Sequence, residues 1–185
     1  MSGGSVDEQV KRANPGEHPL AGTRMTGADI VVQVLADEGV DTIFGYSGGA
    51  ILPTYDAVFR YNDSHQDENG KSPMPLIVPA NEQGAGFMAS GYARASGKVG
   101  VVMVTSGPGA TNTVTPVRDC MADSVPIVVI CGQVPRAAIG TDAFQEAPVT
   151  AIMGAVAKQA GVAAGTAYVH YESKEELVYA TYLEI

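Results

Sequence analysis

Glu82 is the residue of this sequence best placed to do chemistry, because it stands where a strand gives way to a helix. It follows a short apolar run, Leu76-Ile77-Val78, that predicts a buried strand, and it opens a segment over residues 82–96 with Ala, Gly and Met at helical spacing. A carboxylate at such a switch lies at the carboxyl edge of a sheet, where open α/β folds bind ligands. An acid in the first turn of a helix also has an ordinary explanation as a partner of the helix dipole.

Three glycine-rich turns leave predicted strands in the same way as the segment around Glu82. They cover residues 44–50, 105–112 and 132–135. Backbone N–H groups at a helix start can hold an anion or a polar ligand. The second turn is no dinucleotide fingerprint, because Asn112 replaces the third glycine, and it has no Walker lysine. Each turn alone could simply allow close packing, but together with Glu82 at one sheet edge they favour a single ligand crevice.

Strands and helices alternate along the sequence that must position these residues. The predicted strands cover residues 40–44, 76–78, 99–105 and 127–131, and the predicted helices cover residues 23–38, 50–61, 82–96 and 110–123. Continuous Val and Ile runs are typical of parallel strands that are covered on both faces. The alternation therefore predicts an α/β fold, a doubly wound parallel sheet with helices on both faces.

Composition argues against a nucleic-acid-binding, membrane-spanning or disulfide-rich protein. Eleven Lys and Arg against twenty Asp and Glu give a net charge of −9, which disfavours unspecific binding to nucleic acid or to anionic membranes. No apolar run approaches the roughly 18–20 residues that cross a bilayer. Cys120 and Cys131 lie in apolar runs without metal-ligand spacing, so they predict buried thiols in a reducing compartment and no metal site. Residues 1–22 are polar and carry three acids, which predicts a flexible leader and a cytoplasmic protein.

Five spaced motifs resemble the large subunit of acetolactate synthase, a thiamine-diphosphate enzyme. They are Phe44-Gly45-Tyr46-Ser47-Gly48-Gly49-Ala50, Asn81-Glu82-Gln83-Gly84-Ala85, Gly91-Tyr92-Ala93-Arg94-Ala95, Thr105-Ser106-Gly107-Pro108-Gly109-Ala110-Thr111-Asn112, and Gly132-Gln133-Val134-Pro135 with residues 139–146. The resemblance runs from about Thr23 to Lys158 and covers only the pyrimidine-binding domain of such an enzyme. It implies a transferase that condenses pyruvate with a 2-oxo acid in branched-chain amino-acid biosynthesis.

The resemblance also assigns site residues. Glu82 would be the catalytic carboxylate, which shares a proton with a ring nitrogen of the thiamine pyrimidine; a desolvated crevice suits this task. The implied substrate channel is lined by Phe144 and Gln145. The implied cofactor contacts, besides Glu82, are Tyr46, Gly48, Gly49, Thr105, Pro108 and Asn112. Magnesium and FAD would belong to other domains of the intact enzyme, and the implied partners are a second copy, an intact catalytic subunit or a regulatory subunit.

Two residues depart from the family pattern. The family usually has Pro where Ser47 stands and His where Asn81 stands. Ser47 loosens a turn that proline would stiffen. Asn81 cannot titrate, so any acid–base help from an imidazole is lost.

The end of the sequence resembles a different family. Residues 155–177 are similar to the helix-turn-helix of tetracycline-repressor-type regulators, with Gly161 at the turn and a recognition helix over residues 164–171. Ser173 would cap the next helix, and Glu176 would complete a capping box. We therefore expect a flexible leader over residues 1–22, a pyrimidine-binding domain over 23–156 and a helical tail over 157–185.

The change from one family resemblance to the other near residue 156 leaves two functions open. We expect the chain to be a truncated or chimeric fragment of acetolactate synthase, because the 185 residues contain no Gly-Asp-Gly…Asn-Asn motif, which binds the diphosphate and magnesium in that family. Such a fragment is expected to be inactive alone. The alternative is a DNA-binding transcriptional regulator that uses the tail. The tail has two lysines and four glutamates, whereas a DNA-binding element usually offers a basic face, so a helical pair packed on the α/β layer explains it as well.

Overall fold

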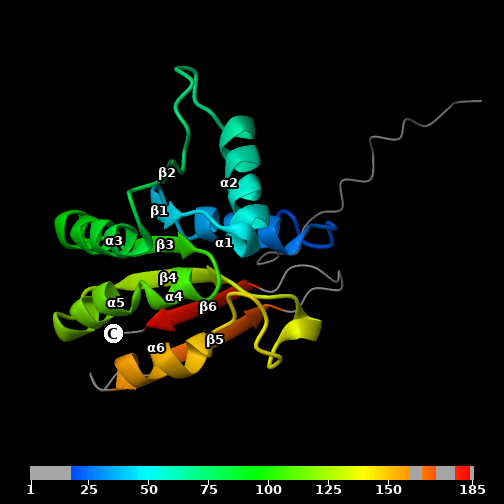
Figure 1. The fold of residues 1–185 in the computed structure, drawn as a ribbon. Helices are drawn as coiled ribbons and strands as arrows, with labels where there is room; N and C mark the ends of the chain where they lie inside the picture. The colour runs from blue at the N-terminus through cyan, green and yellow to red at the C-terminus, as the bar shows by residue number, and fades with distance from the viewer. Residues whose placement is uncertain (1–17, 159–163, 170–177, 184–185) are drawn as a thin grey trace, which may run out of the picture.

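The computed structural model describes the backbone of residues 18–158, 164–169 and 178–183 and the side chains of residues 18–156 (Figure 1). Most of the predicted leader lies outside the described residues. Its last residues form a turn closed by a hydrogen bond from the Ala21 N–H to the His18 carbonyl oxygen, and the His18 Nε2 lies 3.0 Å from the Asp37 carboxylate. No helix in the described part of the chain is both long and apolar enough to cross a membrane.

Four parallel strands form one side of the sheet, in the order β2-β1-β3-β4. They are β1 (Ile43–Tyr46), β2 (Leu76–Ile77), β3 (Gly100–Val104) and β4 (Ile127–Gly132). Tyr46 pairs with Val104, and Val104 with Cys131, so three strands end at the same level. The predicted strand over 76–78 is found as β2, but the prediction that it is buried is wrong, because β2 is a two-residue edge strand in which Ile77 is 39% exposed.

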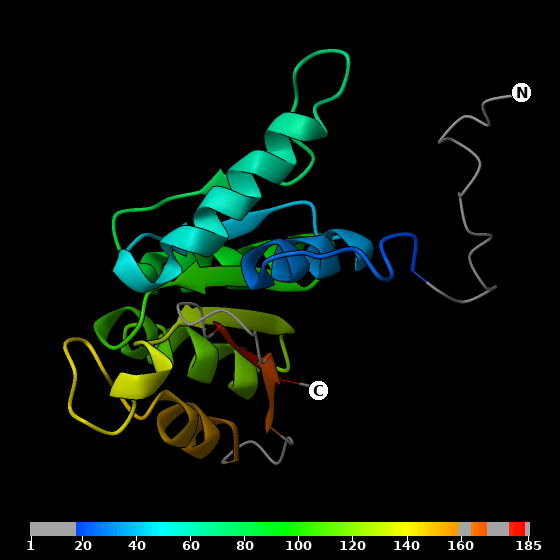
Figure 2. The same ribbon diagram turned by 90° about the vertical axis from the view of Figure 1, so that its right-hand side faces the viewer.

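Helices cover both faces of this sheet, which confirms the doubly wound α/β fold. Val101 and Met103 pack with α1 (Gly27–Asp37) and α2 (Leu52–Ser64), whereas Val102 and Val104 pack with α3 (Glu82–Ser96), α5 (Val114–Ala122) and α6 (Val149–Lys158). Adjacent residues of a strand point to opposite faces, so β3 serves two separate cores. Figure 2 shows α2 and the loop after it standing out from the rest of the molecule.

Local chemistry explains where the helices begin and end. Thr26 caps α1, with its hydroxyl accepting the Asp29 N–H at 3.2 Å. The predicted helix over 50–61 begins as the 3-10 turn η2 (Gly49–Ile51) and continues to Ser64. The predicted helix over 110–123 is split into α4 (Pro108–Thr111) and α5. Pro116 has no N–H to offer the carbonyl of residue 112, so a continuous helix cannot form there.

The predicted helical tail is wrong over residues 164–169 and 178–183, whereas residues 157 and 158 are helical as the end of α6. Residues predicted to form the recognition helix form β5 (Ala164–Val169), which pairs antiparallel with β6 (Val178–Leu183). In turn β6 pairs antiparallel with β4, which extends the sheet to six strands. Four of the six residues of β6 are Val, Thr or Tyr, which favour strands, and β4 offers β6 an edge of backbone donors and acceptors. Gly161, Ser173 and Glu176 lie outside the described residues, and the domain boundary at 156 stays a prediction.

Two glycines of α3 provide a matched test of how closely α3 and α5 pack. A Cβ atom at Gly86 would lie 2.3 Å from Cγ of Pro116, whereas a Cβ atom at Gly91 would have no neighbour within 4 Å. We expect Gly86→Ala to lower the free energy of unfolding by about 1–3 kcal/mol through overpacking. Gly91→Ala should raise it by up to about 1 kcal/mol through helix propensity. Urea unfolding measures both, and equal effects would contradict the packing.

Candidate functional site

Glu82 begins α3 at the carboxyl edge of the sheet, and Asn81 fixes that start. The Asn81 Oδ1 accepts the Gly84 N–H at 2.7 Å, which is a helix N-cap. The Glu82 side chain is half-buried, with one flank against the turn after β3. Asn81, which stands where the family has histidine, therefore caps the helix that carries Glu82.

A hydrogen bond joins Glu82 to the glycine-rich turn after β3. The Asn112 Nδ2 donates to the Glu82 Oε2 at 3.0 Å across thirty residues of sequence. Asn112 directly follows α4, and its own N–H donates to the Pro108 carbonyl oxygen at 3.0 Å. Two of the segments singled out in the sequence thus meet at one carboxylate.

Thr105 holds the turn after β1 against the turn after β3. It is only 5% exposed, and its Oγ1 accepts the Ala50 N–H at 3.3 Å. A Cβ atom at Gly48 would lie 2.5 Å from the Thr105 Cβ, and one at Gly109 would lie 2.7 Å from its Cγ2. These positions need glycine because the backbone passes so close to Thr105.

The loop after β4 closes on the same turn. A Cβ atom at Gly107, whose φ is +51°, would lie 2.2 Å from the Gln145 carbonyl oxygen. The loop is tied by the Glu146 carboxylate, which accepts the Gly140 N–H at 2.5 Å and the Ala143 N–H at 3.1 Å. At Gly132 a Cβ atom would lie 2.6 Å from the Ala50 backbone, so the turn after β4 also touches the turn after β1.

The remaining predicted site residues belong to the turns after β1 and β3 and to the loop after β4, and they differ in how far they are exposed. Tyr46, Gly49 and Pro108 are exposed, and Phe144 is 87% exposed. Gly48 and Gln145 are half-buried. The geometry brings the four segments together, and the roles of these residues as cofactor or channel contacts stay predictions.

Tyr55 is a site residue that the sequence analysis missed. Its ring is 5% exposed, and its hydroxyl donates to the Met103 carbonyl oxygen at 3.0 Å. Burial raises the pKa of Tyr55, and the negative charge of Glu82 raises it further. No sequence signal marks Tyr55, because its place depends on Gly45 across the fold, where an added Cβ atom would lie 2.3 Å from the Tyr55 hydroxyl oxygen.

These residues fit the pyrimidine of thiamine diphosphate. Glu82 keeps Oε1 on the side of Gly109, where an added Cβ atom would lie 3.6 Å from that oxygen. Among the described residues, Oε1 accepts no hydrogen bond. A half-buried carboxylate with one free oxygen suits a ring nitrogen that carries a proton. No group of three side chains that could hold a metal ion occurs in the part of the chain described.

Comparison with known proteins gives the family. The family described as thiamine pyrophosphate enzyme, N-terminal TPP binding domain, matches residues 25–153. The acetolactate synthase catalytic subunit of Saccharomyces cerevisiae is 56% identical over 128 residues, which are 69% of this chain and 17% of that protein. The acetolactate synthase of Mycobacterium bovis is 50% identical over 135 residues, 73% of this chain and 20% of that protein. The chain therefore belongs to the thiamine pyrophosphate enzymes and carries their N-terminal TPP binding domain.

A chloroplastic acetolactate synthase of Arabidopsis thaliana is also similar, at 47% identity over 132 residues, 71% of this chain and 18% of that protein. The chain spans no more than 20% of the length of these relatives. A second family, bacterial regulatory proteins of the tetR family, matches residues 140–181. Residues 140–153 fall within both matches, and the second match includes all of β5 and residues 178–181 of β6.

The loop tied by Glu146 should respond to acid. Hydrogen bonds from the backbone N–H groups of Gly140 and Ala143 hold the pKa of Glu146 below its ordinary value of 4.5. Because the folded pKa is lowered, the stabilisation is complete above pH 4.5 and is lost as the pH falls through the folded pKa. We expect Glu146→Gln to be less stable than the parent at pH 7 and the difference to shrink below pH 4.5 in urea unfolding. Glu68→Gln, in the exposed loop after α2, is the control; a difference independent of pH would contradict the assignment.

Proposed function

We propose that this chain provides the pyrimidine-binding half of an acetolactate synthase-like enzyme, which condenses pyruvate with a 2-oxo acid in branched-chain amino-acid biosynthesis. The observation that carries the proposal is the Glu82 carboxylate, held by Asn112 through Oε2 with Oε1 left beside Gly109. Thiamine diphosphate, when bound, stabilises the negative charge that develops on the reacting carbon. The protein supplies its placement and the movement of a proton.

Each residue then has a separate task. Glu82 is the catalytic residue, whose Oε1 accepts or returns a proton at a ring nitrogen. Gly48 and Gly109 keep side chains out of the crevice, and Thr105 holds their two turns together. Tyr46, Gly49 and Pro108 are proposed to contact the cofactor. Phe144 and Gln145 are proposed to line the approach of the substrate.

The complete reaction needs more than the matched region. The relatives are about five times longer than the stretch they share with this chain, which is 17–20% of their length. The family resemblance assigns the diphosphate with its Mg²⁺, and FAD, to other domains of the intact enzyme. We therefore propose that the 185 residues alone bind the pyrimidine end and do not catalyse the condensation.

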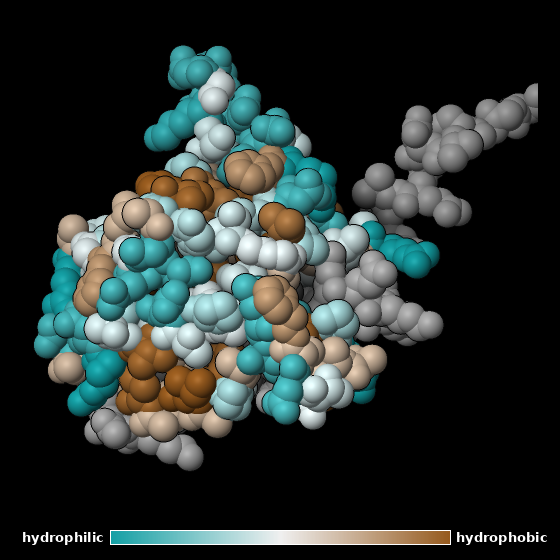
Figure 3. Space-filling model, in the orientation of Figure 1, coloured by the Kyte–Doolittle hydropathy of each residue, from teal (hydrophilic) through white to brown (hydrophobic). Residues whose placement is uncertain are grey.

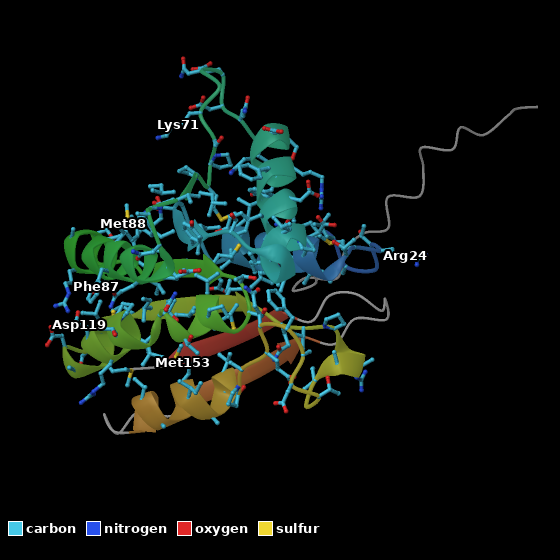
Figure 4. All side chains as sticks on the ribbon, viewed as in Figure 1. Arg24, Lys71, Phe87, Met88, Asp119 and Met153 are labelled. Atoms are coloured by element: carbon cyan, nitrogen blue, oxygen red, sulfur yellow. The ribbon has the colours of Figure 1, made fainter. Side chains whose placement is uncertain are left out.

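Exposed apolar side chains support pairing with another protein chain. Ile77 and Val78 lie at and just after β2, where Figure 3 shows apolar residues at the surface. Phe87 and Met88, labelled on α3 in Figure 4, are 43% and 39% exposed. Such surfaces commonly mark protein contacts, so we propose pairing with a second copy or an intact catalytic subunit in the cytoplasm.

Binding of thiamine tests the proposal without requiring turnover. In a ¹H–¹⁵N NMR titration of the 185-residue chain, thiamine should move the signals of residues beside the crevice and saturate. Because the chain is proposed to hold only the pyrimidine end, thiamine diphosphate with Mg²⁺ should bind about as well as thiamine. Glu82→Gln should abolish the response, whereas Glu68→Gln should keep it.

Two results would count against the proposal. Absence of any saturable response to thiamine would contradict a pyrimidine site. Much tighter binding of thiamine diphosphate than of thiamine, measured by calorimetry, would contradict the assignment of the diphosphate site to other domains.

A DNA-binding regulator is the second candidate, favoured by the tetR family match over residues 140–181. The described backbone has a strand over Ala164–Val169, where that function needs a recognition helix. We expect no mobility shift with duplex DNA at low salt. A shift that is lost when Tyr168 and His170 are both replaced by Ala would favour the regulator instead.

A further inference from the structure

We propose that Asn112 is a positioning residue for Glu82. The inference rests on the proposed function, because it explains how the acid of that site is presented. Its central observation is the bond from the Asn112 Nδ2 to the Glu82 Oε2, 3.0 Å long. A carboxylate accepts hydrogen bonds only, so the amide must turn its nitrogen, and not its oxygen, toward Glu82.

The backbone beneath Asn112 is well anchored. The Asn112 N–H donates to the Pro108 carbonyl oxygen at 3.0 Å at the end of α4. The next residue, Thr113, is fully buried, and its hydroxyl donates to the Ala110 carbonyl oxygen at 2.6 Å. The backbone that carries the Asn112 amide is therefore held in place, as positioning of another side chain requires.

No other side chain described here does the same work. Tyr55 feels the charge of Glu82, but its hydroxyl donates to the Met103 carbonyl oxygen. The Asn81 side chain is occupied by the Gly84 N–H. Within residues 18–156, Asn112 thus gives the only side-chain hydrogen bond to Glu82, and it is the group that restricts rotation of the carboxylate.

A neutral amide suits this task better than a charged donor. Lys or Arg at position 112 would pair with the carboxylate as an ion and compete with any proton shared at the other oxygen. Asp would repel it. Asn112 engages Oε2 without cancelling the charge, and Gly109 leaves the side of Oε1 open.

NMR of the unliganded chain tests the contact directly. We expect the two side-chain amide protons of Asn112 to differ strongly in chemical shift and to move together in Glu82→Ala, where the acceptor is gone. The same change should leave the side-chain amide of Asn69, in the exposed loop after α2, in place. Asn112 signals that do not respond to Glu82→Ala would overturn the inference.

Thiamine affinity then tests positioning. Asn112→Ala and Asn112→Asp should each weaken thiamine binding by about three- to tenfold, the order expected for one hydrogen bond to a charged group at an exposed site, with Asp the weaker binder. Asn69→Asp adds the same charge far from the crevice and should bind as the parent does. Parent-like affinity in Asn112→Asp, which keeps the shape and loses the donor, would overturn the inference. If the parent itself binds no thiamine, the proposed function fails, and the amide signals alone decide whether Asn112 positions Glu82.

Discussion

The arrangement of the turns around Glu82 depends on how closely two glycine backbones pack against one buried threonine. Thr105 directly follows β3, and Gly48 and Gly109 approach it from two different turns at distances that leave no room for a Cβ atom. The Thr105 hydroxyl adds a hydrogen bond to the Ala50 N–H. Dispersion contacts of this kind are strong only at short range, so the two turns have one arrangement and not a range of them. The position of Glu82 relative to both turns follows from this packing and from its bond to Asn112.

The sequence was sufficient to predict the helix that carries Glu82, because both of its ends are chemically marked. Asn81 caps the start, and Gly97 adopts a left-handed φ of +72° at the end, so α3 runs from Glu82 to Ser96 as predicted. The prediction that the glycine-rich turns meet at one edge followed from parallel strand order alone. The place of Tyr55 could not be predicted in this way, because it depends on the missing side chain of Gly45, a neighbour across the fold.

The tail shows why a local pattern can give the wrong element. Residues 164–171 match a helical motif in sequence, yet Ala164–Val169 forms a strand beside Val178–Leu183. Apart from proline, residue preferences for helix or strand differ by about 1 kcal/mol or less and are overridden by the surroundings. Here the surroundings include the open side of β4, which no reading of the tail alone can reveal.

The pairing of β6 with β4 has a consequence for how this fold tolerates change over evolution. The ladder from Val128–Tyr182 to Gly132–Val178 is made by peptide groups, which every residue except proline carries in the same form. Pairing with β4 therefore depends on the length and the extended conformation of the neighbouring segment, and little on its side chains. A segment of a different sequence could therefore complete the layer, provided that it is extended and that proline does not interrupt its N–H groups.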